Sequence, residues 1–195
     1  MIRKDDIVMT DPLIGVSPAY VISRFGDQFT ANQMAAGLED AAAMGFGGFQ
    51  PEVFHRRDLV DWQKRGASLV ARQARTSGLQ ATQFVAHFML HAFSTPQLLE
   101  DTAPLDDIRA VIDIVAHFDA CRIITVPLGL FEAAAGDPAG ETGDHFRRFR
   151  DRIGRLTEVV SAAGCRMALE KPFALPCLRR AVISGICRRF IVGMS

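Results

Sequence analysis

Five short apolar runs, each followed by a stretch with helical periodicity, constrain the fold of this chain more than any other feature. Their centres recur about every 33 to 44 residues, the length of a strand plus a returning helix. Strands and helices that alternate in this way form βαβ units, which build parallel sheets with right-handed crossovers. We therefore expect an α/β fold with a parallel sheet. The predicted strands are residues 12–18, 46–50, 81–88, 121–127 and 166–170.

Local signals predict where the helices begin and end. Pro18 is expected to close the first strand, with a loop through residues 24–27. Thr30 and Gln33 have the spacing of a capping box, so a helix should begin there and end at Gly45. Further helices are expected at 59–78, at 96–115 with a kink near Pro104, and at 146–164.

Two architectures fit this pattern: an open doubly wound sheet, and part of an eight-stranded barrel. The first predicted strand is not followed by GxGxxG, and the sequence contains no P-loop, so the nucleotide-binding form of the open sheet loses its main support. The barrel reading is an incomplete (β/α)8 TIM barrel of about five βα units, because a full barrel needs about 250 residues.

Composition narrows the class of partner. The formal net charge is zero and there is no long basic block, which argues against nucleic acid and against an anionic membrane surface. No apolar run approaches the roughly 20 residues of a membrane-spanning helix, and the N-terminus does not resemble a signal peptide. We expect a cytoplasmic protein that acts on a small molecule.

Three side chains stand where predicted strands end, which is where the active sites of barrels lie. Glu170 ends the fifth strand, His87 the third and Glu52 the second. Each has an ordinary structural alternative. Glu170 could be a solvated or salt-bridged strand end, and His87 a histidine satisfied by its neighbours. A register slip of one residue would turn Glu52 into the barrel wall.

Four segments resemble the xylose isomerase-like TIM barrel superfamily, which includes the sugar phosphate isomerases and epimerases and the AP endonuclease type 2 enzymes. They are Gly15–Pro18, Gly45–Phe49 leading to Glu52, Gln83–Phe88, and Ala163–Glu170. The resemblance covers about residues 12–170 and rests on the order and spacing of these segments.

The resemblance implies a divalent metal ion, Mn²⁺, Mg²⁺, Co²⁺ or Zn²⁺, at the barrel mouth. Of the ligands that the family commonly places after strands five to eight, only the first has a counterpart, Glu170. It also implies that His87 contacts substrate or transfers a proton, with Glu52 as a second catalytic candidate. The expected reaction is the metal-dependent isomerisation or epimerisation of a sugar or sugar phosphate. An inactive truncated barrel or a non-catalytic binding domain remains the alternative, and a DNA endonuclease is disfavoured by the neutral charge.

The sequence changes character after Glu170. Residues 171–195 contain five basic residues and no acidic ones: Lys171, Arg179, Arg180, Arg188 and Arg189. We expect a partial barrel domain at 1–170 and an atypical basic tail at 171–195 that results from a frameshift or truncation. The alternative is a native short C-terminus that packs as a helix. In a partial barrel the first and fifth strands would have open edges, which predicts self-association.

Overall fold

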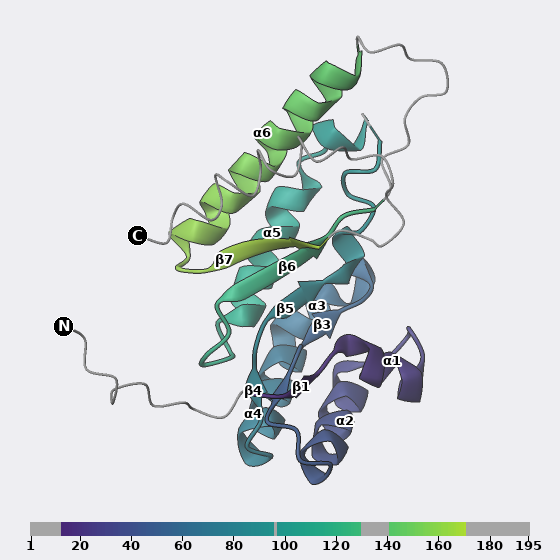
Figure 1. The fold of residues 1–195 in the computed structure, drawn as a ribbon, viewed down its shortest axis with the longest axis vertical. Helices are drawn as coiled ribbons and strands as arrows, with labels where there is room; N and C mark the ends of the chain where they lie inside the picture. The colour runs from purple at the N-terminus through teal and green to yellow at the C-terminus, as the bar shows by residue number, and fades with distance from the viewer. Residues whose placement is uncertain (1–12, 96, 130–140, 171–195) are drawn as a thin grey trace, which may run out of the picture.

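The structure, a computed structural model, describes residues 13–95, 97–129 and 141–170, without the side chains of 141–146 (Figure 1). Two parallel sheets have the strand orders β1-β2-β4 and β3-β5-β6-β7. Parallel strands alternate with helices, which confirms the predicted α/β class. The strands are β1 Gly15–Val16, β2 Gly48–Phe49, β3 Glu52–Val53, β4 Gln80–Ala81, β5 Phe84–Ala86, β6 Ile123–Pro127 and β7 Arg166–Glu170.

Two of the five predicted strands are each divided in two. The second run forms β2 and β3 on either side of Pro51, and the third run forms β4 and β5. Proline has no N–H for the ladder, so it interrupts regular pairing. Backbone bonds still cross the break, since Thr82 N donates to Phe49 O at 3.0 Å and Val85 N to Pro51 O at 2.9 Å. The two sheets therefore meet along this break.

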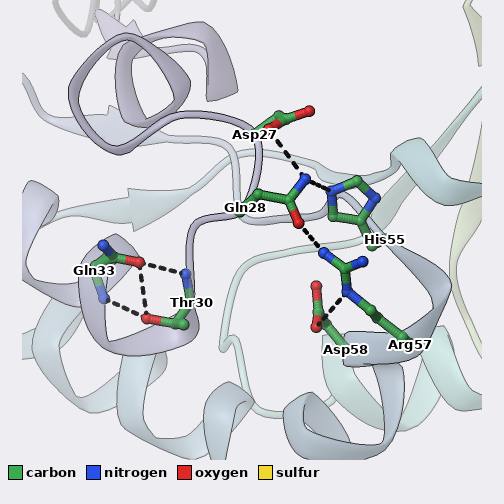
Figure 2. Close-up of polar contacts among 7 residues, drawn as sticks. All are labelled: Asp27, Gln28, Thr30, Gln33, His55, Arg57 and Asp58. Atoms are coloured by element: carbon green, nitrogen blue, oxygen red, sulfur yellow. Dashed lines mark hydrogen bonds and ion pairs between the residues drawn. The ribbon is translucent and has the colours of Figure 1, made fainter.

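The predicted capping box is present at the start of α2 (Ala31–Ala43). Gln33 N donates to Thr30 Oγ1 at 3.3 Å, and Thr30 N donates to Gln33 Oε1 at 2.8 Å (Figure 2). Gly45, which has a φ of +88°, follows the helix where its end was predicted. The other helices are α1 Pro18–Phe25, α3 Leu59–Asp61, α4 Ala67–Thr76, α5 Ala103–Val115 and α6 Glu141–Ala162, and a π-helical turn, Trp62–Gly66, joins α3 to α4.

Two proline predictions were wrong in the same way. Pro18 does not close the first strand before a loop but occupies the first turn of α1, and Pro104 does not kink a helix but lies in the first turn of α5. The fixed φ of proline suits a first turn, where its missing N–H is no loss. The predicted helix from residue 96 therefore begins only at Ala103, after a 3₁₀ turn at Leu98–Glu100.

Helices α3 and α5 lie along the β3-β5-β6-β7 sheet, whereas α1 and α2 lie near β1 (Figure 1). Buried residues of the helices and strands form one hydrophobic core. Phe84, Ile124 and Val126 are fully buried in this core. Trp62 packs edge-on against Phe84, with ring centroids 6.3 Å apart. No helix in the described part of the chain is long and apolar enough to cross a membrane. The proposed division at residue 170 stays a prediction, because 171–195 lie outside the described residues.

Gly66 lies where α2 packs closely against the π-helical turn. A Cβ built on Gly66 would be 2.9 Å from Ala31 Cβ and 3.4 Å from the Trp62 ring. Real Cβ atoms do not approach each other this closely, and both neighbours are buried. Glycine is therefore required at this position by contact, although its backbone is helical.

We expect Gly66→Ala to destabilise the protein by about 1–2 kcal/mol, because overpacking exceeds the helix propensity that alanine adds. Gly154→Ala in α6 is the matched control, since its Cβ would meet no atom within 4 Å. That variant should gain up to about 1 kcal/mol. Urea unfolding measures both changes, and equal effects of the two variants would contradict the packing argument.

Cys121, just before β6, is fully buried, and its Sγ lies 3.8 Å from the Ile123 carbonyl oxygen that accepts its hydrogen bond. Burial penalises the thiolate and raises the pKa of Cys121 to about 11. Compared with an ordinary thiol of pKa 9.0, this leaves about a hundredfold less thiolate near neutral pH.

Iodoacetamide at pH 8 should therefore leave Cys121 unmodified in the native protein and alkylate it in urea, as read by peptide mass spectrometry. The folded state holds the thiol proton more tightly than the unfolded chain, so this contribution to stability is fully present below pH 9 and falls as the pH rises from 9 through 11. Rapid labelling of Cys121 in the native protein would show that the thiol is exposed.

Candidate active site

The structure brings two of the three predicted site residues together. Glu52 lies in β3 and is 2% exposed, and His87 begins the 3₁₀ turn directly after β5. His87 Nδ1 is 3.4 Å from Glu52 Oε1. This is longer than a strong charge-assisted hydrogen bond, but pairs of this kind often tighten only around substrate. A buried carboxylate thus orients a partly exposed imidazole.

Phe54 fixes the plane of the His87 ring. The two rings are stacked, with centroids 4.0 Å apart and an interplanar angle of 12°. The His55 ring also contacts Phe54, in an edge-to-face arrangement with ring centroids 4.9 Å apart. Sequence reasoning did not identify Phe54 as a site residue, because an aromatic side chain at a strand end is most simply read as core.

A cluster of polar residues lies next to Phe54, and we call it the rim network. It consists of Asp27, Gln28, His55, Arg57 and Asp58 (Figure 2). Gln28 Nε2 is 2.8 Å from His55 Nε2 and 3.1 Å from Asp27 Oδ1, and Arg57 donates to Gln28 Oε1. The loop between α1 and α2 is thereby tied to the segment after β3. No spacing in the sequence indicates this contact, since it joins residues 27–28 to 55–58.

The rim network determines the tautomer of His55. Arg57 can only donate, so the Gln28 atom that faces it is the oxygen, and the amide nitrogen faces His55. His55 Nε2 must then accept a hydrogen bond. In the neutral ring the proton is therefore on Nδ1.

Glu170 lies at the end of β7, in register with Pro127 of β6. Its side chain is exposed, and β5 and β6 separate it from β3. With strands about 4.8 Å apart, it is not a direct partner of the Glu52–His87 pair. It does lie at the carboxyl end of its strand, as the sequence indicates.

The described residues do not form a metal centre. No group of three or more His, Cys, Asp or Glu side chains in the described part of the chain could hold an ion. Hard divalent ions use several oxygen ligands, and Glu170 supplies one carboxylate. Its role as a metal ligand stays a prediction.

Comparisons with known proteins agree on the fold. A family model described as "Xylose isomerase-like TIM barrel" matches residues 38–174. No curated protein matches the sequence. Among solved structures, a putative xylose isomerase from Rhodospirillum rubrum has a TM-score of 0.60 and 18% identity, covering 83% of this chain and 54% of that one.

Two further solved structures are named as epimerases. The 3-keto-D-glucoside 4-epimerase from E. coli has a TM-score of 0.56 and 16% identity, covering 93% of this chain and 64% of its own. The D-allulose 3-epimerase from Methylomonas sp. has a TM-score of 0.51 and 15% identity, covering 80% and 50%. At these identities the similarity shows the fold alone. The chain spans about half to two thirds of the length of these structures.

For the neutral ring of His55, we expect the Nδ1–H tautomer in long-range ¹H–¹⁵N spectra. Arg57 and Asp27 both orient the Gln28 amide, so the double variant Arg57→Met/Asp27→Ala should let it flip, and the Nε2–H form should grow. His117, at the end of α5 and outside the rim network, serves as an internal control and should not respond. A dominant Nε2–H form of His55 in the unmodified protein would contradict the deduction from Arg57.

Proposed function

Because the chain belongs to the xylose isomerase-like TIM barrel family, we propose that Glu52 and His87 are the acid–base pair of a sugar isomerase or epimerase site. The observation that supports this most directly is the contact of His87 Nδ1 with the buried Glu52 carboxylate at the barrel mouth. The epimerase names of two structural neighbours support a sugar as the small-molecule substrate.

The pair suits proton transfer next to a carbonyl. Glu52 accepts the Nδ1–H of His87, which leaves Nε2 as the atom that accepts a proton. When Nε2 takes the proton from the carbon beside the sugar carbonyl, the C–H bonding electrons form an enediolate. The Glu52 carboxylate stabilises the resulting imidazolium.

The return of the proton decides the product. If His87 returns it to the former carbonyl carbon, and the proton of the neighbouring hydroxyl group moves to the former carbonyl oxygen, an aldose and a ketose interconvert. One base is then sufficient for the carbon-bound proton. Inversion at a single carbon requires a proton donor on the opposite face of the sugar. The Glu52–His87 pair is therefore sufficient for isomerisation. For epimerisation it supplies one of the two groups that the reaction needs.

The finer expectations remain proposals. Glu170 is proposed to contribute to a divalent metal site, for which the described residues supply no further ligands. We also propose that the substrate is a sugar or a sugar phosphate and that the protein is cytoplasmic. Open strand edges are proposed to cause self-association. The reading of the protein as free of nucleic acid and membrane partners rests on its neutral charge.

Deuterium exchange tests the acid–base proposal without assuming which product forms. D-Fructose and D-xylose incubated with the protein in D₂O should incorporate deuterium beside the carbonyl, as followed by ¹H NMR. Glu52→Gln and His87→Asn should each reduce the exchange rate by about 10²- to 10⁴-fold, the usual contribution of a general base. The double variant should lose little more than either single variant, because the two residues act together.

His117→Asn is the matched control, since this histidine lies outside the Glu52–His87 pair and the rim network, and it should leave exchange unchanged. Normal exchange in His87→Asn would refute the proposed base. If the unmodified protein binds sugars in calorimetry but catalyses no exchange, the alternative of a non-catalytic binding domain is correct.

A further inference from the structure

Two buried polar side-chain atoms among the described residues have no hydrogen-bond partner: Glu52 Oε2 and Thr125 Oγ1. Glu52 is 2% exposed and Thr125 is 4% exposed. Buried polar atoms almost always have partners, and leaving one without a partner costs stability. Thr125 of β6 was not among the residues that the sequence indicated.

The two atoms belong to one row of the sheet. Glu52 is in register with Val85, Val85 with Thr125, and Thr125 with Ala168, and we call these four residues the inner row. Residues in register on parallel strands project from the same face of a sheet. Their sequence neighbours Val53, Phe84 and Ile124 face the helices as part of the hydrophobic core. The inner row therefore faces the barrel interior.

In the inner row, Glu52 and Thr125 lie two strands apart. Two strand spacings place the backbones of Glu52 and Thr125 about 10 Å apart, with Val85 between them. A ligand oxygen that forms hydrogen bonds of about 2.8 Å to both side chains would connect them across the row.

Threonine is not explained at position 125 by packing alone. Valine has nearly the same shape and would leave no buried hydroxyl without a partner. The hydroxyl of Thr157 in α6 shows the ordinary arrangement, since it donates to Ile153 O at 2.8 Å. Buried polar groups that lower stability in the free protein are typical of functional sites.

We propose that Thr125 binds a hydroxyl group of the substrate, which lies between Thr125 Oγ1 and Glu52 Oε2 in the barrel interior. This inference rests on the proposed function, because it takes the ligand to be a sugar. A carboxylate accepts hydrogen bonds, whereas a threonine hydroxyl donates and accepts. A ligand hydroxyl satisfies both by donating to Glu52 and accepting from Thr125. A phosphate group would be repelled by Glu52, so the end of the sugar that enters the inner row is not phosphorylated.

Thr125→Val tests this with two readouts, thermal unfolding without ligand and calorimetric titration with D-fructose. The melting temperature should stay equal or rise, because a buried polar atom without a partner is removed. The affinity for D-fructose should fall about tenfold or more, because Glu52 loses the hydroxyl that helps it hold the ligand. Thr125→Ser, which retains the hydroxyl, should bind within about threefold of the unmodified protein.

Thr157→Val is the matched control and should leave D-fructose affinity unchanged. A fall in melting temperature for Thr125→Val with unchanged affinity would overturn the inference, since it would mean that the hydroxyl holds a structural water. Unchanged affinity at an equal melting temperature would overturn it as well. If the unmodified protein binds no D-fructose, the proposed function fails together with this inference, whereas binding that is unaffected by Thr125→Val refutes the inference alone.

Discussion

The alternation of side chains along the parallel strands determines which residues of this chain can do chemistry. On the helix-facing side, Phe84, Ile124 and Val126 are fully buried in the hydrophobic core. One residue along, the opposite face carries the Glu52 carboxylate and the Thr125 hydroxyl. A shift of one residue in register would exchange these faces and bury two polar groups among the helices. The core therefore fixes the register, and the register positions the site.

This arrangement costs stability on the inner face of the strands. Glu52 is nearly inaccessible to water, and one of its oxygens lacks a partner among the described residues. Such a group is tolerated because the surrounding sheet and helices are well packed. The helix-facing side of the strands sets stability, and the opposite side carries the candidate site. A change in the core such as Gly66→Ala therefore lowers stability and leaves Glu52 and Thr125 in place.

Local sequence signals predicted local structure well and long-range contacts poorly. The capping box at Thr30 and the helix end at Gly45 involve residues within one turn, so spacing alone was sufficient. Pro18 was misread because proline both ends strands and begins helices, and only packing decides between them. Glu52 and His87 were predicted separately from strand ends, but their contact depends on register. Thr125 gave no signal, since a threonine in a strand is common.

The two histidines that flank Phe54 differ in which ring nitrogen contacts a neighbour. His55 Nε2 accepts from Gln28, so its lone pair is already used in the rim network. His87 faces a carboxylate through Nδ1, and within the described part of the chain no residue forms a hydrogen bond with its Nε2. The neutral His55 ring then carries its proton on Nδ1. The role proposed for His87 requires the same tautomer, with Nε2 left to accept a proton. Because Phe54 stacks on His87 and meets the edge of His55, the rim network also supports the ring plane in which that nitrogen is held. The same short segment after β3 thus contains His55 of the rim network and Phe54, which stacks on the proposed base His87.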